Sequence, residues 1–146
     1  MSSLRRILEI KGFGVWSVTP ETTVFDALRL MEEKNIGVVL VMAGEELLGI
    51  FSERDYARQV ILKGRASKDT AVKQIMTNPV ITAHPEQTTQ EGMEIMTKGH
   101  FRHLPVVEKN HVLGVISMGD VVRDIIFQKS KHIKELQNRK DEHIVA

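Results

Sequence analysis

The feature that most constrains this chain is an internal repeat with a fixed spacing. The Pro-Glu pair at Pro20 is found again 65 positions later at Pro85, and the same offset holds without a gap as far as Arg58. Matches that keep one register and fall on Pro, Gly, Ser and Asp are not expected by chance, so the chain should contain two copies of one structural unit. The other matched pairs are Glu21 with Glu86, Thr23 with Thr88, Met31 with Met96, Val41 with Val106, Leu48 with Leu113, Gly49 with Gly114, Ser52 with Ser117, Asp55 with Asp120 and Arg58 with Arg123.

Each copy has the hydrophobic pattern of a β-α-β-β-α unit. After a short strand, Thr23 and Thr88 each begin a Thr-x-x-acid sequence, which is the capping-box signature of a helix start. Two closely spaced apolar runs then predict a β-hairpin, and a last helix begins at Ser52 or Ser117. We expect Tyr56, Val60 and Ile61, or Val121, Val122, Ile125 and Ile126, on the inner face of that helix. The predicted strands are Val15–Val18, Ile36–Met42 and Leu47–Phe51, and in the second copy Val80–Ala83, Leu104–Val107 and Val112–Ile116.

The segments outside the two copies are short. Ser3–Lys11 is predicted to form a helix that ends at Gly12, and the polar stretch Lys63–Asp69 joins the copies as a loop. The charged tail has the pattern of a helix with a narrow apolar edge at Ile133 and Leu136. These features predict an N-terminal helix over residues 1–14, the two repeats over 15–66 and 67–128, and a helical tail over 129–146.

The composition excludes several classes of protein. The 146 residues are 42% hydrophobic and 27% charged with a net charge of +1, which indicates a globular, water-soluble chain without the basic surface that nucleic-acid binding requires. There are no cysteines, so disulfides and thiolate chemistry are excluded. The longest apolar run, Val38–Ala43, is far shorter than a membrane helix, and Met1–Arg6 lacks the apolar region of a secretion signal. We therefore expect a cytoplasmic protein with no membrane partner.

The two copies resemble a known family. Gly49–Asp55 and Gly114–Asp120 both read Gly-hydrophobic-hydrophobic-Ser-x-x-Asp, and Arg102–Val107 is a basic pair before a Leu-Pro-Val-Val strand. From about Val15 to Gln128 the chain is similar to tandem CBS-domain proteins, also called Bateman modules. The resemblance implies a mixed α/β (α+β) fold of two β-α-β-β-α repeats packed through their sheets with pseudo-two-fold symmetry. It also implies up to two clefts between the repeats, a disc-shaped homodimer, and an adenosine ligand such as AMP, ADP, ATP, NAD or S-adenosylmethionine.

The Ser-x-x-Asp sequences have two readings. Each serine is a good helix cap and each aspartate completes a capping box. A carboxylate also offers acceptor oxygens for the two neighbouring hydroxyls of a ribose, and it keeps an anionic phosphate away from that helix end. We therefore predict ribose binding at Ser52 and Asp55, and at Ser117 and Asp120.

The basic pair is the best candidate for a phosphate site. Arg102 offers a rigid fork of donors and His103 a further donor that strengthens when protonated, although both could be exposed residues at a strand start. The first copy has Gly37 and Val38 instead, so the two clefts should differ. Following the family, Ser52 and Asp55 would act with Arg102 and His103, and Ser117 and Asp120 with the Ile36–Val38 edge. Adenine is predicted to lie against the segment that leads each copy, near Ile81, Thr82 and Ala83 or near Trp16, Val18 and Thr19, and the predicted adenine-pocket residues also include Ile36, Gly37 and Val38.

Three functions remain open from the sequence. A regulatory nucleotide-binding module that signals to an unknown partner is favoured over an enzyme acting on nucleotides, because no nucleophile is paired with a base and no phosphate loop is present. The third is a structural adaptor with empty clefts. His100-x-x-His103 has no nearby carboxylate in sequence, so no metal site is predicted.

Overall fold

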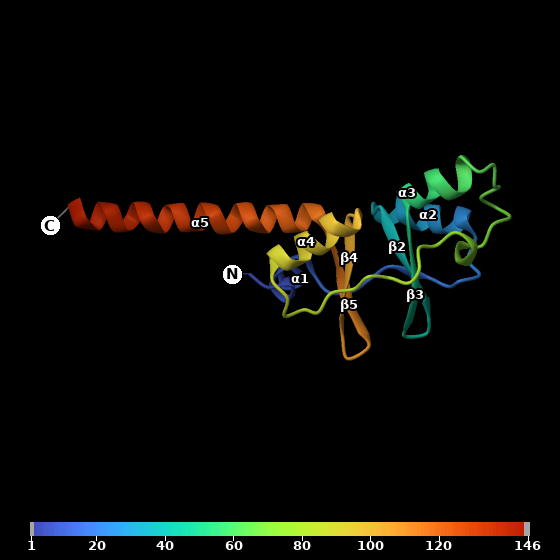
Figure 1. The fold of residues 1–146 in the computed structure, drawn as a ribbon, viewed down its shortest axis with the longest axis horizontal. Helices are drawn as coiled ribbons and strands as arrows, with labels where there is room; N and C mark the ends of the chain where they lie inside the picture. The colour runs from blue at the N-terminus through green and yellow to red at the C-terminus, as the bar shows by residue number, and fades with distance from the viewer. Residues whose placement is uncertain (1, 145–146) are drawn as a thin grey trace.

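The computed structural model describes residues 2–144, with side chains as far as Lys140. It is a mixed α/β structure with two small sheets. The two β-hairpins occupy the middle of the molecule, helices lie at both outer ends, and one long C-terminal helix extends away from the body (Figure 1). The predicted fold class is confirmed.

The first copy builds a three-stranded sheet in the order β1-β2-β3, with β1 parallel to β2 and β2 antiparallel to β3. The last helix of this copy begins at Glu53 and changes after one turn to a wider π-helical turn, η1. The elements are β1 (Ser17–Val18), α2 (Val24–Lys34), β2 (Val38–Ala43), β3 (Glu46–Ser52), α3 (Glu53–Tyr56) and η1 (Ala57–Ile61).

The second copy repeats this arrangement with two differences. Its sheet has only the antiparallel pair of strands, and its last helix is continuous. The elements are α4 (Thr89–Gly99), β4 (His103–Glu108), β5 (His111–Ser117) and α5 (Met118–Ile144).

The local signals read from the sequence position these elements. The side chains of Thr23 and Thr88 accept hydrogen bonds from the backbone of Asp26 and Glu91, so both predicted helix starts are confirmed. Both helices end at a residue in the left-handed conformation, Asn35 with φ 53° and the equivalent His100 with φ 59°. A left-handed residue terminates a helix, and here it directs the chain into the hairpin strand that follows.

The core of each copy is completed by the segment that leads into the other copy. Helix α1 (Leu4–Lys11) buries Leu4, Ile7 and Leu8 in the core of the second copy. The segment with the short 3-10 helix η2 (Val72–Gln74) falls within the predicted bounds of the second repeat and leads into its strands, but it enters the core of the first copy. The attachment is equivalent on both sides, because the Arg5 N–H donates to the Pro85 carbonyl and the Lys73 N–H to that of Pro20.

Two predictions about the elements are corrected. The strand expected at Val80–Ala83 is reduced to one paired residue, Ala83, because its partner strand has Pro105 where the first copy has Leu40, whose N–H donates to the Trp16 carbonyl. The inner face of the last helices is narrower than expected. Val60 and Val121 are fully buried, whereas the side chains exposed to solvent are Ile61, Val122 and Ile126.

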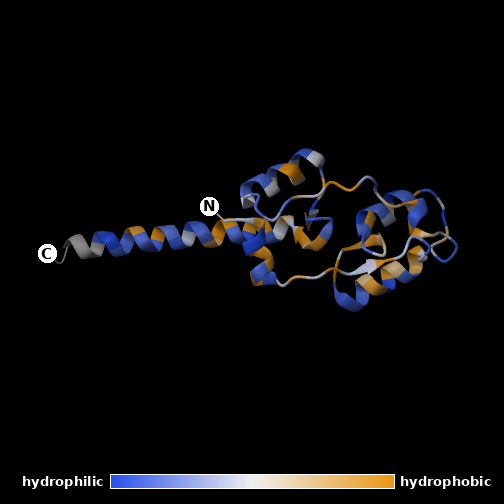
Figure 2. Cartoon of the chain, turned by 90° about the horizontal axis from the view of Figure 1, so that it is seen from below, coloured by the Kyte–Doolittle hydropathy of each residue, from blue (hydrophilic) through white to orange (hydrophobic). Residues whose placement is uncertain are grey.

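The charged tail is not a separate helix but continues α5 without a break. From Lys129 to Lys140 every described residue is exposed, and the few apolar residues are spread among polar ones along the helix (Figure 2). No helix in the described part of the chain is long and apolar enough to cross a membrane.

The packing of α1 predicts that its buried face stabilises the second copy. Leu8→Ala removes a side chain that is 0% exposed, and we expect the free energy of unfolding to fall by about 2–5 kcal/mol. Ile10→Ala, on the same helix but at a side chain 70% exposed, is the matched control and should change it by less than about 0.5 kcal/mol. Urea denaturation of both variants measures the difference; equal losses would contradict this role of α1.

Candidate functional site

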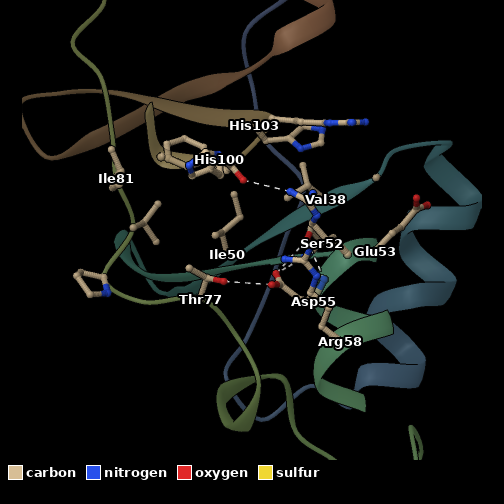
Figure 3. Close-up of a pocket in the computed structure, with 17 residues that line it drawn as sticks. Val38, Ile50, Ser52, Glu53, Asp55, Arg58, Thr77, Ile81, His100 and His103 are labelled. Carbon is tan, nitrogen blue, oxygen red and sulfur yellow. Dashed lines mark hydrogen bonds between the residues drawn. The ribbon is translucent and has the colours of Figure 1, made fainter. Parts of the chain in front are cut away.

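A cavity of about 550 Å³ lies between the two copies. This volume is within the range of roughly 300–1,000 Å³ that small-molecule sites occupy. Its walls come from the start of β2, the end of β3 and α3 in the first copy. The segment around Thr77 and the end of α4 with the start of β4 complete the walls (Figure 3). The lining residues are Gly37, Val38, Ile50, Ser52, Glu53, Arg54, Asp55, Arg58, Thr77, Pro79, Val80, Ile81, Gly99, His100, Phe101, Arg102 and His103.

Ser52 and Asp55 form a capping box on the floor of this cavity. The Ser52 side chain accepts from the Asp55 N–H at 3.1 Å, and the Asp55 carboxylate accepts from the Ser52 N–H at 2.9 Å through Oδ2. The capping interpretation is therefore confirmed. Each carboxylate oxygen can accept two hydrogen bonds, so capping alone does not use up the acceptor capacity of Asp55.

The segment that enters the core of the first copy also brings Thr77 to Asp55. Thr77 and Ile50 exchange two backbone hydrogen bonds of 2.9 and 3.1 Å, which fixes the segment against β3. The Thr77 hydroxyl then donates to Asp55 Oδ1 at 3.2 Å (Figure 3). Sequence reasoning missed Thr77 because the fixed offset begins at Pro20 and its equivalent Pro85, so the repeat gave no signal for the segment that contains Thr77.

Arg102 and His103 line the same cavity from the second copy. Arg102 is exposed, and its carbonyl accepts from the Met118 N–H at 2.8 Å, which ties the start of β4 to the start of α5. Burial, reinforced by the positive charge of Lys11, lowers the pKa of His103 below its usual value. The lowered pKa favours the neutral imidazole at pH 7, so the stronger donor expected of a protonated His103 would form only in more acidic solution.

Further charged groups reach the cavity that were not among the predicted site residues. Arg54 and Arg58 come from α3 and η1, and Arg54 donates to the His100 carbonyl at 3.1 Å, a contact between the two copies. Glu53 adds a negative charge near Gly37. The one available signal was that Arg58 recurs as Arg123 in the repeat.

The predicted adenine pocket is only partly assembled. Ile81 lines the cavity with Ser52 and Asp55, and so do Gly37 and Val38, which corrects the prediction that this edge acts with Ser117 and Asp120. Ala83 is buried in the core of the second copy, and Thr82 lies on a separate groove beside the hairpin turns. Outside this cavity lie Trp16, Val18, Thr19 and Ile36, which belong to the predictions for the second cleft.

Ser117 and Asp120 form the equivalent capping box but do not line this cavity. Lys11 donates to Asp120 Oδ2 at 2.7 Å and Arg123 to Oδ1 at 2.7 Å. Burial acts to raise the pKa of Asp120, but the hydrogen bond and charge of Lys11 outweigh it together with the Ser117 backbone N–H, so the pKa lies below its usual value. Asp120 is therefore an ionised carboxylate with cations on both oxygens.

The cavity has the chemistry of a binding site. It combines apolar walls, a carboxylate with free acceptor capacity, and arginines that can pair with an anion. Among the described residues, no group of three or more His, Asp or Glu side chains is arranged to hold a metal ion.

Comparison with known proteins agrees with this geometry. The family model of the CBS domain matches twice, at residues 13–61 and 72–126. A CBS domain-containing protein of Arabidopsis thaliana, the mitochondrial CBSX3, is 42% identical over 131 residues, which are 86% of this chain and 62% of that protein. This chain therefore spans less than two thirds of the length of that relative.

Solved structures share the fold. A signal-transduction protein with CBS domains from Burkholderia ambifaria is 43% identical with a TM-score of 0.83, and the match covers 86% of this chain and 94% of that one. The structure of CBSX2 in complex with AMP has a TM-score of 0.71 at 23% identity, over 88% and 99% of the two chains, and shows likeness of fold. With two matched repeats that face each other across one cavity, the chain belongs to the CBS-domain family as a tandem pair.

Proposed function

We propose that this chain is a regulatory module that binds an adenosine nucleotide in the cavity between its two copies and does no chemistry on it. The observation that carries the proposal is that Ser52 and Asp55 of the first copy and Arg102 and His103 of the second line one cavity. A ribose acceptor and a phosphate donor thus lie on opposite walls of a space of nucleotide size. The AMP bound to CBSX2, a protein of the same fold, supports the ligand class.

The ribose belongs at Asp55. Oδ1 of this carboxylate accepts only the Thr77 hydroxyl at 3.2 Å, and Asp55 makes no ion pair within the described residues. A ribose hydroxyl can donate a second hydrogen bond to this oxygen, or it can replace the neutral Thr77 hydroxyl. The adenine base would then lie against the apolar wall that includes Val38 and Ile81.

The phosphate belongs at Arg102. Its guanidinium is a permanent cation with paired donors, whereas His103 is neutral at pH 7 and adds one N–H donor. Arg54 and Arg58 lie on the cavity wall as further cations. AMP, ADP, ATP and NAD all satisfy this arrangement, because each has an adenosine with a phosphate on its ribose.

The signal to an unknown partner would pass through a homodimer. Ile61 at the end of η1, Leu62 directly after it, and the equivalent Ile126 and Phe127 on α5 are all more than half exposed. These four residues, called here the helix-end patches, are apolar groups at matching places on both copies. Two-fold pairing of two chains is the commonest way to cover such a surface.

The phosphate assignment predicts a selective loss. Arg102→Ala should weaken AMP by roughly 10- to 150-fold, equivalent to a charge-assisted hydrogen bond of about 1.5–3 kcal/mol, and should leave adenosine nearly unchanged. Asp55→Asn keeps a capping oxygen but removes the carboxylate, so it should weaken AMP and adenosine alike. Isothermal titration calorimetry with both ligands measures these changes.

Arg29→Ala, at an exposed position of α2, is the control and should alter neither affinity. Equal losses of AMP and adenosine in Arg102→Ala would refute the phosphate assignment. If AMP, ADP, ATP and NAD all leave the melting temperature unchanged at millimolar concentration, the adaptor reading is correct instead, because a ligand at 100 times its Kd should stabilise by about 2.7 kcal/mol. Turnover of any of these nucleotides would establish an enzyme.

The lowered pKa of His103 predicts a pH dependence of stability. Between the folded-state pKa and the unfolded value near 6.5, the unfolded chain binds more protons at this residue, so stability rises with pH and is lost as the solution is acidified. His103→Gln should therefore lose less unfolding free energy between pH 7 and about pH 5 than the unchanged chain. An NMR titration that gives His103 a pKa at or above 6.5 would contradict this.

The helix-end patches predict a dimer that depends on them. Light scattering should give twice the chain mass of 16.5 kDa, and the double change Ile61→Asp with Ile126→Asp should give the monomer mass. Ile133→Asp, on the projecting part of α5, is the control and should remain dimeric. A monomer at micromolar concentration in the unchanged chain would exclude the dimer, and dissociation by Ile133→Asp alone would place the interface on the tail.

A further inference from the structure

Lys11, the last residue of α1, lies against the aspartate that was expected to bind ribose in the second copy. Its ammonium donates to Asp120 Oδ2 and to the Val115 carbonyl, both at 2.7 Å. The side chain of Asp120 is only 10% exposed. The Lys11 ammonium is therefore held by two acceptors, the Asp120 carboxylate and the backbone of β5, in a partly buried environment.

The equivalent aspartate of the first copy has no such partner. The segment that packs on the first copy brings to Asp55 the neutral hydroxyl of Thr77, whereas α1 brings to Asp120 the ammonium of Lys11. The two aspartates have the same backbone capping interactions, since each accepts from the N–H of its serine, Ser52 or Ser117. Two cations thus distinguish the sites: Arg123 on Asp120 Oδ1, which belongs to the repeat, and Lys11 on Oδ2, which reaches the site from α1.

A second lysine, Lys34, covers the side chain that an adenine base would contact in the second site. Trp16 corresponds to Ile81 of the first cavity, and the ammonium of Lys34 lies 4.4 Å from the centre of the Trp16 ring. Lys34 itself corresponds to Gly99, which lines the first cavity. The exposed aromatic surface is consequently occupied by a cation.

We propose that Lys11 closes the second site of this chain to nucleotides, so that each chain binds one nucleotide, in the Asp55 cavity. The inference rests on the proposed function and adds its stoichiometry and the residue that sets it. Trp16, Ser117 and Asp120 then have a structural role. Lys34 takes the place of the base beside Trp16, and Lys11 takes the place of a ribose hydroxyl beside Asp120.

The physical reason is the difference between an ammonium and a hydroxyl as partners of a carboxylate. A ribose hydroxyl that displaced Lys11 would exchange a charge-assisted hydrogen bond for a neutral one. It would also leave the ammonium without the Asp120 carboxylate and the Val115 carbonyl. At Asp55 the exchange is between two hydroxyls, so binding there carries no such penalty.

Lys11→Met tests this directly. Isothermal titration with AMP should give one site per unchanged chain and two per Lys11→Met chain, with the affinity of the first site preserved. Lys11→Arg retains a cation and should keep one site, and Lys131→Met, at an exposed position of α5, should also keep one. If Lys11→Met does not fold by circular dichroism, Lys11→Ala takes its place.

A second measurement shows whether the ion pair is the cause. NMR titration should give a higher pKa for Asp120 in Lys11→Met than in the unchanged chain, because the main group that lowers it has been removed. Two sites in the unchanged chain, one site in Lys11→Met, or an unchanged Asp120 pKa would each overturn the inference. Absence of AMP binding in both chains would overturn the proposed function itself, whereas the Asp120 titration would still report on the ion pair.

Discussion

The interaction on which the rest of the structure depends is the exchange of leading segments between the two copies. Helix α1, which precedes the first copy, is buried in the core of the second, and the segment around η2, which precedes the second copy, is buried in the core of the first. Each copy has a hydrophobic surface that its own elements leave uncovered. The buried leucines of α1 therefore connect the N-terminus to the far half of the molecule and hold both copies in one arrangement.

The same exchange determines what each aspartate contacts. The segment that packs on the first copy ends with Thr77 beside Asp55, and the helix that packs on the second ends with Lys11 beside Asp120. Two sites built from the same Ser-x-x-Asp sequence thus acquire different electrostatics from residues outside the repeat motif. The close approach depends on small residues, because a side chain at Gly114 would lie 2.6 Å from the buried Leu8, and one at Gly49 would lie 2.4 Å from Met76.

Much of the fold could be predicted because its signals are local. The capping threonines, the hairpin runs and the Ser-x-x-Asp helix starts act within a few residues, and the repeat doubled each signal. The wrong predictions have the same cause, because local signals carry no information about distant contacts. The apolar residues Ile61 and Ile126 were assigned to the core, although they are exposed. The apolar pattern of a helix does not show which of its apolar residues contact another element. The Val80–Ala83 strand failed because pairing depends on a partner edge.

The sequence by itself determined that two β-α-β-β-α copies exist, where their helices begin, and that Ser52, Asp55, Arg102 and His103 are the residues to bring together. Only the tertiary structure decided which segment completes each core, and therefore that Thr77 reaches Asp55 and Lys11 reaches Asp120. It also decided that the pKa of His103 lies below its usual value, since this shift depends on burial and on Lys11, which is 92 positions away in the chain. Local hydrogen bonds can be read from neighbouring residues, whereas burial and charge contacts depend on which distant segments pack together.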